Sequence, residues 1–171
     1  MGKLRILGLF IVFYLWFGTT NAQYYDTFPR YGFSSVKEAA DSLYVRLLDK
    51  EYRGVQVFTI NYPSFIRETR KVDTVVPEPM IRGQYITYWS RCDRSFKKAR
   101  KAVKKAGYSA KKCQQDTVLY YKNTGAEVTR AELYIQQKKG KGYLKFQLWR
   151  IEEKWYLTGK VEWVEVKPIK S

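Results

Sequence analysis

The spacing of apolar residues changes near residue 113 from a helical to a strand period, and this change limits the fold more than any other feature of the chain. Before residue 113, apolar residues recur every three or four positions over two long stretches, as on the buried face of an α-helix. After it, apolar and polar residues alternate, which is typical of β-strands with one buried face. Helices followed by strands predict a single α+β domain with N-terminal helices and an antiparallel sheet of about four strands.

Two helices are predicted in the first part of the chain. The first begins at the capping-box pattern Ser35–Glu38 and ends before Gly54. The second begins near Pro79, ends near Gly107 and is about 29 residues long if it is continuous. The apolar face of the first helix follows the helical spacing without exception, at Val36, Ala39, Ala40, Leu43, Tyr44, Leu47 and Leu48.

Residues 55–78 give a weaker pattern. Val55–Ile60 is compatible with a short strand or with a helix, and prolines at positions 63, 77 and 79 interrupt the residues after it. We expect most of this segment to be loop, with one short helix.

The last third of the chain alternates like a series of strands. Asn123–Gly125, Lys138–Gly142 and Glu152–Lys154 are expected to be the turns between them. Because linkers this short join antiparallel neighbours, the strands are expected to form an antiparallel sheet whose apolar face packs on the helices. The predicted strands are Asp116–Lys122, Ala131–Gln136, Leu144–Trp149 and Leu157–Trp163.

The N-terminus has the pattern of a secretory signal peptide. Basic residues precede an apolar run, Ile6–Phe17, and the small residues Thr20 and Ala22 come after it. The apolar run is shorter than the roughly 20 residues of a membrane span, so we expect cleavage before Gln23 and no span thereafter. We therefore expect a periplasmic or secreted protein with a signal peptide at 1–22, an irregular lead-in at 23–34, one α+β domain at 35–167 and a tail at 168–171.

The chain is strongly basic, with 32 Lys and Arg, 16 Asp and Glu and a formal net charge of +16. Such a charge attracts anionic partners. For an exported protein, nucleic acid is disfavoured, and the expected partner is lipopolysaccharide, an acidic polysaccharide, lipid headgroups or an acidic protein. Histidine is absent, which removes the commonest metal ligand. The carboxylates lack the spacing of a metal loop, and we expect neither a metal nor a cofactor.

The sharpest local feature is a basic segment at 91–112, which holds ten Lys and Arg against one acid, Asp93. One interpretation is a platform for phosphate or sulfate groups. In a variant of it, the apolar stripe of the same helix, which includes Phe96 and Val103, enters a membrane. The simpler alternative is that this stripe packs on the sheet and the cations form a solvated face. The predicted platform consists of Arg94, Lys97, Lys98, Arg100, Lys101, Lys104, Lys105, Lys111 and Lys112.

Cys92 and Cys113 are the only cysteines. If the helix runs to Gly107, Cys92 lies about 22 Å back along it, whereas the six residues from Gly107 to Cys113 reach at most about 20 Å. Either the helix ends earlier or the cysteines stay apart, and the second outcome is favoured. The neighbouring Arg91 and Arg94 are expected to lower the pKa of Cys92.

The sequence assigns no catalytic residue. Glu38, Asp41 or Asp116 could serve a pocket as a carboxylate, but surface solvation is the default. Several aromatics fall opposite the aliphatic face of the strands, where they could bind sugars or bases by stacking, although aromatics favour strands in any case. These aromatics are among Tyr24, Tyr25, Tyr120, Tyr121, Tyr134, Tyr143, Trp149, Trp155, Tyr156 and Trp163.

The order of elements resembles the nuclear transport factor 2-like (cystatin-like) superfamily, in particular its exported bacterial members. The likeness spans about 35–166 and is carried by the helix Val36–Tyr52, the helix that ends near Gly107, and the strand segments Ala131–Ile135, Tyr143–Leu148 and Lys154–Leu157. It implies helices inside a curved sheet that encloses a conical pocket. Catalytic members commonly use an Asp–His or a Tyr–Asp set, and this chain lacks the histidine.

Three classes of function are compatible with these observations. The leading one is a non-catalytic binding module of the envelope or extracellular space, which engages an anionic or small ligand through the pocket or the basic helix. The second is a small pocket isomerase or hydrolase that uses a carboxylate and a tyrosine. The third is an assembly partner in an envelope complex, with the basic helix docked on an acidic protein. Fold alone does not choose among them.

Overall fold

A computed structural model describes residues 30–51, 53–122, 127–138 and 140–166. The predicted signal peptide, Tyr24, Tyr25, the turn Asn123–Gly125 and the tail 168–171 lie outside these residues. The predicted α+β order is confirmed, because the helical elements come first and an antiparallel sheet comes after them. The elements are α2 (Val36–Leu48), η1 (Gln56–Phe58), α3 (Tyr62–Val72), α4 (Glu78–Lys105), β1 (Gln114–Lys122), β2 (Val128–Gln137), β3 (Gly140–Ile151) and β4 (Lys154–Val166).

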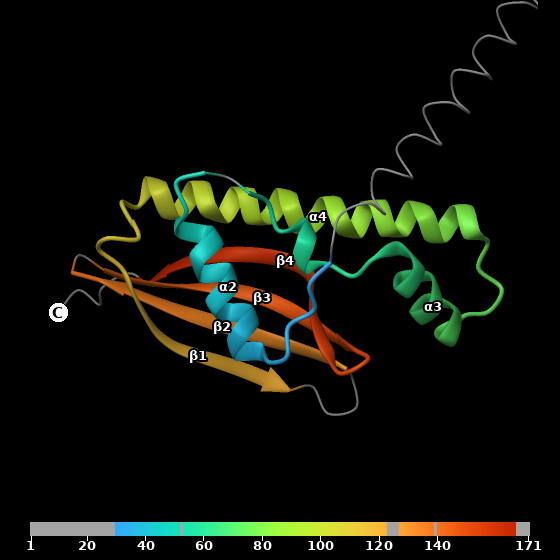
Figure 1. The fold of residues 1–171 in the computed structure, drawn as a ribbon. Helices are drawn as coiled ribbons and strands as arrows, with labels where there is room; N and C mark the ends of the chain where they lie inside the picture. The colour runs from blue at the N-terminus through green and yellow to red at the C-terminus, as the bar shows by residue number, and fades with distance from the viewer. Residues whose placement is uncertain (1–29, 52, 123–126, 139, 167–171) are drawn as a thin grey trace, which may run out of the picture.

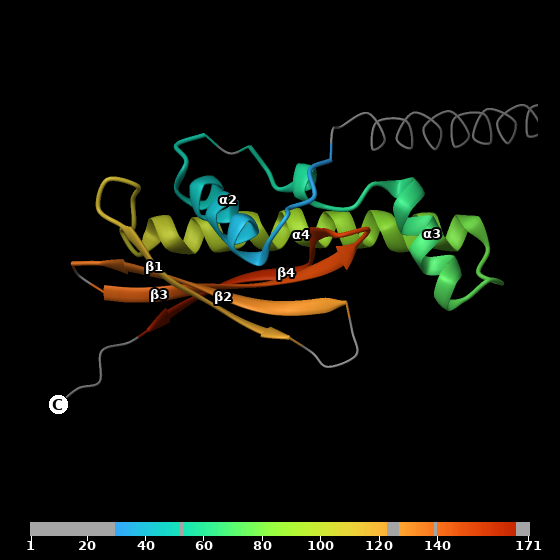
Figure 2. The same cartoon turned by 60° about the horizontal axis from the view of Figure 1, so that its bottom comes forward.

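The four strands form one sheet in the order β1-β2-β3-β4, with every neighbouring pair antiparallel. Figures 1 and 2 show a twisted sheet with the helices on one side of it and with α4 running beside β4. Alternate residues on β2 and β3 are buried beneath the helices, including Leu133, Leu144 and Phe146. We call this buried side the inner face of the sheet and the opposite side its outer face.

Helix α2 begins as its sequence predicts. The Ser35 hydroxyl accepts a hydrogen bond from the backbone N–H of Glu38 (3.1 Å), and the Glu38 carboxylate accepts one from the backbone N–H of Ser34 (2.7 Å). These bonds satisfy N–H groups that have no partner within the helix. The apolar face of α2 lies on the inner face of the sheet, where Leu43 and Leu47 are fully buried.

The prediction of one helix within residues 55–78 is confirmed by the eleven-residue helix α3, and Val55–Ile60 contains the helical turn η1. The expectation that most of the segment is loop was wrong. The side chain of Asn61 caps α3 by accepting a hydrogen bond from Ser64 N (2.8 Å), and Pro63 lies in the first turn, where its missing N–H costs nothing. Phe65 packs this helix against Tyr85 and Tyr88 of α4.

Helix α4 binds the edge of β4 through three polar side chains. Tyr88 donates to the Leu157 carbonyl (2.6 Å), the Cys92 thiol donates to the Gly159 carbonyl (3.2 Å), and the Ser95 hydroxyl accepts from the Val161 N–H (3.0 Å). These side chains follow helical spacing, and their partners follow strand spacing. An exposed strand edge invites pairing with other chains, so these contacts close part of the edge of β4.

The core fills the space between the helices and the sheet. The apolar stripe of α4, which consists of Phe96, Ala99 and Val103, is buried in the same cluster as the inner-face residues of the sheet. Trp163 of β4 lies over Gly142 of β3, where a Cβ atom would collide with the indole ring. Because the α4 stripe is inside the protein, the variant in which it enters a membrane is wrong.

Candidate functional site: the basic face of helix α4

Six of the predicted platform residues form a single stripe on α4. At 100° per residue they fall within an arc of about 120°, opposite the buried stripe, and span about 16 Å along the axis. All six side chains are exposed, and Asp93 is the only carboxylate between Arg91 and Lys112. Lys98, Lys101 and Lys105 form no ion pair with another described residue. We call this surface the basic face; it consists of Arg94, Lys97, Lys98, Lys101, Lys104 and Lys105.

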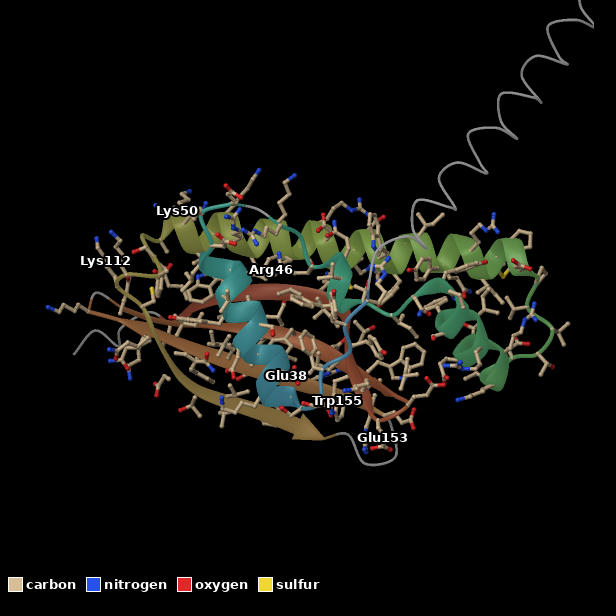
Figure 3. All side chains as sticks on the ribbon, viewed as in Figure 1. Glu38, Arg46, Lys50, Lys112, Glu153 and Trp155 are labelled. Atoms are coloured by element: carbon tan, nitrogen blue, oxygen red, sulfur yellow. The ribbon has the colours of Figure 1, made fainter. Side chains whose placement is uncertain are left out.

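Three further cations lie close to the C-terminal end of α4. Lys111 and Lys112, both predicted as platform residues, are exposed on the connection from α4 to β1. Lys50, at the end of α2, is brought beside α4 by a contact with Arg100, and Figure 3 shows Lys50 and Lys112 at this end of the helix. The sequence did not predict Lys50 as part of this surface, because its proximity to α4 depends on how the two helices pack.

The prediction that Arg100 belongs to the platform was wrong. Arg100 is buried, and its guanidinium donates hydrogen bonds to the backbone carbonyls of Asp49 and Lys50 (2.9 Å to Lys50). These carbonyls lie just beyond the end of α2, where backbone acceptors lack partners within the helix. Arg100 therefore joins α2 to α4 and does not present its charge to a ligand.

None of the three candidate pocket carboxylates lies in a dry cavity. Glu38 and Asp116 are exposed, and Asp41 is half-buried. Hydrogen bonds from Ser34 lower the pKa of Glu38. Partial burial opposes the ionisation of Asp41, but hydrogen bonds from Lys37 and Gln115 outweigh it and lower its pKa. Both are thus ionised carboxylates with structural partners, unlike a general acid, whose pKa is raised.

Cys92 and Cys113 are both buried free thiols. Burial raises the pKa of Cys92 to about 12, and the opposing effect of Arg91 is smaller. Arg91 thus lowers the pKa of Cys92 as expected, but burial outweighs this effect and the net shift is upward. Burial also raises the pKa of Cys113. Neither thiol has the thiolate character that nucleophilic catalysis requires.

The aromatics of the sheet divide between its two faces. Trp155 and Trp163 pack against the core. On the outer face, the rings of Tyr134 and Tyr143 stack with their centroids 5.0 Å apart, and Tyr121 is 54% exposed. Among the sheet rings whose exposure the structure describes, only Tyr121 is broadly exposed, and it lies beside polar neighbours on the outer face.

Two hollows are lined in part by residues of α4. The smaller, of about 320 Å³, runs between α4 and β4 and is lined by Lys98, Ala102 and Trp163 among others. The larger, of about 580 Å³, lies on the outer face of the sheet. Lys160 and Glu162 of β4 line both hollows, which are therefore adjacent.

Comparison of the chain with protein-family models, with curated proteins and with solved structures finds no match in any of the three. Among the residues that the structure describes, no three His, Cys, Asp or Glu side chains are grouped so that they could hold a metal ion. Across the same residues, every helix is too short or too polar to span a bilayer.

Proposed function

We propose that this protein is an exported, non-catalytic binding module of the cell envelope or extracellular space, and that the basic face of α4 binds an anionic partner. The observation that carries the proposal is the separation of the two sides of α4. One side is buried in the core, and the other presents six exposed cations within about 120°. Clustered cations of this kind bind polyanions by releasing their counterions.

The proposed ligand carries repeated phosphate, sulfate or carboxylate groups. The rigid helix fixes the spacing of the cations, so little conformational entropy beyond that of the lysine side chains is lost on binding. A lipopolysaccharide, an acidic polysaccharide and an anionic lipid surface share this chemistry. A membrane would be contacted through charge alone, because the apolar stripe of α4 lies in the core.

We also propose that the fold is a member of the nuclear transport factor 2-like superfamily. Helices followed by a twisted four-stranded antiparallel sheet support this proposal. In this chain the space that would be a conical pocket contains Phe96, Leu144 and Phe146. Filling of that space argues against the alternative of a pocket isomerase or hydrolase, as does the absence of a dry carboxylate among Glu38, Asp41 and Asp116.

The experiment that tests the binding function is elution from heparin-agarose in a salt gradient. In one variant, four lysines of the basic face become glutamate: Lys97→Glu, Lys98→Glu, Lys101→Glu and Lys104→Glu. We expect this variant to elute at much lower salt than the parent protein, because its binding surface then repels the polymer.

The matched control makes the same change in charge at exposed lysines outside α4: Lys37→Glu, Lys138→Glu, Lys141→Glu and Lys154→Glu. We expect the control to elute close to the parent protein. Elution of both variants at the same salt concentration would show that net charge, and not the basic face, determines binding. Sedimentation with phosphatidylglycerol vesicles, compared with heparin, then separates a lipid surface from a polysaccharide.

A further inference from the structure

The hollow on the outer face of the sheet is built by all four strands. Glu132 of β2, Lys145 of β3 and Glu162 of β4 are directly paired across the sheet, and Arg130 of β2 pairs with Gln147 of β3. These residues alternate with buried ones, so their side chains point away from the helices. Tyr121 of β1 pairs with Arg130 and completes the lining on that side.

A bulge in β4 shapes the side of the hollow next to α4. Between its pairs with Lys145 and Gln147, β4 contains two more residues than β3, and Gly159 there has a φ of +70°. The amide oxygen of Gln147 occupies the space that a side chain at Gly159 would need. Bulges commonly redirect side chains beside functional sites, and here Lys160 of the bulge lines the hollow.

Helix α4 holds this bulge in place and contributes a cation to the hollow. The Cys92 thiol binds the Gly159 carbonyl, and Ser95 accepts the Val161 N–H, so the bulge is fixed at both ends. Arg91, next to Cys92, lines the hollow from the helix. The cations of the hollow thus come from separate elements that are fixed relative to one another.

The charges of the hollow are only partly paired. Glu132 accepts a hydrogen bond from Tyr134 (2.9 Å) and lies 3.5 Å from Lys145. Arg91, Arg130 and Lys160 form no ion pair with another described residue. The hollow therefore offers three available cations next to one further carboxylate, Glu162.

This combination fits a sugar acid better than a phosphate. An arginine binds a carboxylate through two parallel hydrogen bonds. Glu162 and Gln147 can accept hydrogen bonds from the several hydroxyls of a sugar, whereas a phosphate dianion has a single O–H to donate. The exposed ring of Tyr121 can contact the C–H face of a pyranose, because the face of an aromatic ring is electron-rich.

We propose that the outer-sheet hollow binds a hexuronate residue, with Arg130 on its carboxylate and Tyr121 against its ring. This site lies apart from the basic face and adds a second function to it. Its volume of about 580 Å³ is in the range of small-ligand sites. The smaller hollow, lined by Lys98 and Lys160, leads from this site to the basic face, so one acidic polysaccharide chain could contact both.

The test is titration of the protein with trigalacturonate, followed by calorimetry and by NMR. We expect the parent protein to bind it and to bind neither maltotriose, which lacks carboxylates, nor inorganic phosphate at the same concentration. Arg130→Gln and Tyr121→Ala should each weaken binding by about tenfold or more, as expected for loss of one charge-assisted or stacking contact. Arg130→Lys keeps the positive charge but cannot form the two parallel hydrogen bonds of a guanidinium. Its affinity for trigalacturonate should lie between those of Arg130→Gln and the parent protein.

Arg70→Gln is the matched control, because Arg70 is an exposed arginine on α3. It should bind trigalacturonate like the parent protein. The inference is overturned if the parent protein does not bind trigalacturonate, if Arg130→Gln binds it normally, or if phosphate or maltotriose binds equally well. The four-lysine variant of the basic face should lose heparin retention and keep trigalacturonate binding. The proposal for the basic face and the proposal for the outer-sheet hollow can therefore be contradicted independently.

Discussion

Arg100 shows how one residue in a run of cations can have a role different from that of its neighbours. Lys101, the next residue, is exposed on the basic face, whereas Arg100 is buried and bonded to carbonyls beyond the end of α2. On a helical wheel the two positions differ by 100°. This places Arg100 at the boundary of the buried stripe, where a long side chain can reach the neighbouring helix.

We predict that Arg100→Ala lowers the free energy of unfolding by about 2 kcal/mol, because it removes the charged donor of two hydrogen bonds that join α2 to α4. Lys101→Ala, its matched control, should change it by about 0.5 kcal/mol or less, as is usual for an exposed side chain. Urea unfolding followed by circular dichroism measures both values. Equal stability of the two variants would contradict the assigned role of Arg100.

At the scale of elements, the sequence predicted those parts of the fold that have a long, regular period. Helix α2 and the four strands follow their apolar patterns closely, and α4 ends at Lys105 where its stripe predicts an end near Gly107. The extent of helix α3 was missed because only one buried residue, Glu68, lies within it. Its signals were local: the cap at Asn61 and the proline at position 63.

The candidate sites were predictable to different degrees. The basic face could be read from the sequence because its cations share one helix. The outer-sheet hollow could not, because Arg130, Gln147 and Lys160 come together only through the register of three strands and the bulge in β4. No pattern within a single strand indicates which residues of its neighbours lie beside it.

The contact between α4 and the edge of β4 leads to a prediction about how strongly the Val161 amide is protected from hydrogen exchange with solvent. In Ser95→Ala, the Val161 N–H loses its acceptor (3.0 Å in the parent structure), and the bulge loses one of its two ties to α4. We expect the Val161 amide to exchange with solvent at least about tenfold faster, which corresponds to loss of one hydrogen bond.

Native-state hydrogen exchange by NMR measures this rate. The amides of Leu133 and Leu144, which lie on central strands with buried side chains, are the internal reference and should change little. Unchanged protection of Val161 would mean that α4 does not close this edge. The same variant should keep its affinity for heparin, because Ser95 lies outside the basic face.

For the whole molecule, the absence of histidine determines how binding responds to pH. With 32 Lys and Arg and no His, no side chain of ordinary pKa titrates between pH 5 and 8. Glu38 and Asp41 have lowered pKa values and so remain ionised at pH 5, while the pKa of Cys92, about 12, keeps its thiol neutral. The net charge is therefore nearly constant over this range.

We predict that the salt concentration at which the protein elutes from heparin stays constant from about pH 5.5 to about pH 8, although binding depends strongly on salt at each pH. Heparin keeps its sulfate charge over the same range, so neither partner changes. Elution in salt gradients at several pH values measures this directly. A steep loss of retention between about pH 6 and pH 8 would require a group at the interface that titrates in this range. The basic face consists of lysines and one arginine, so it could not then be the whole binding site.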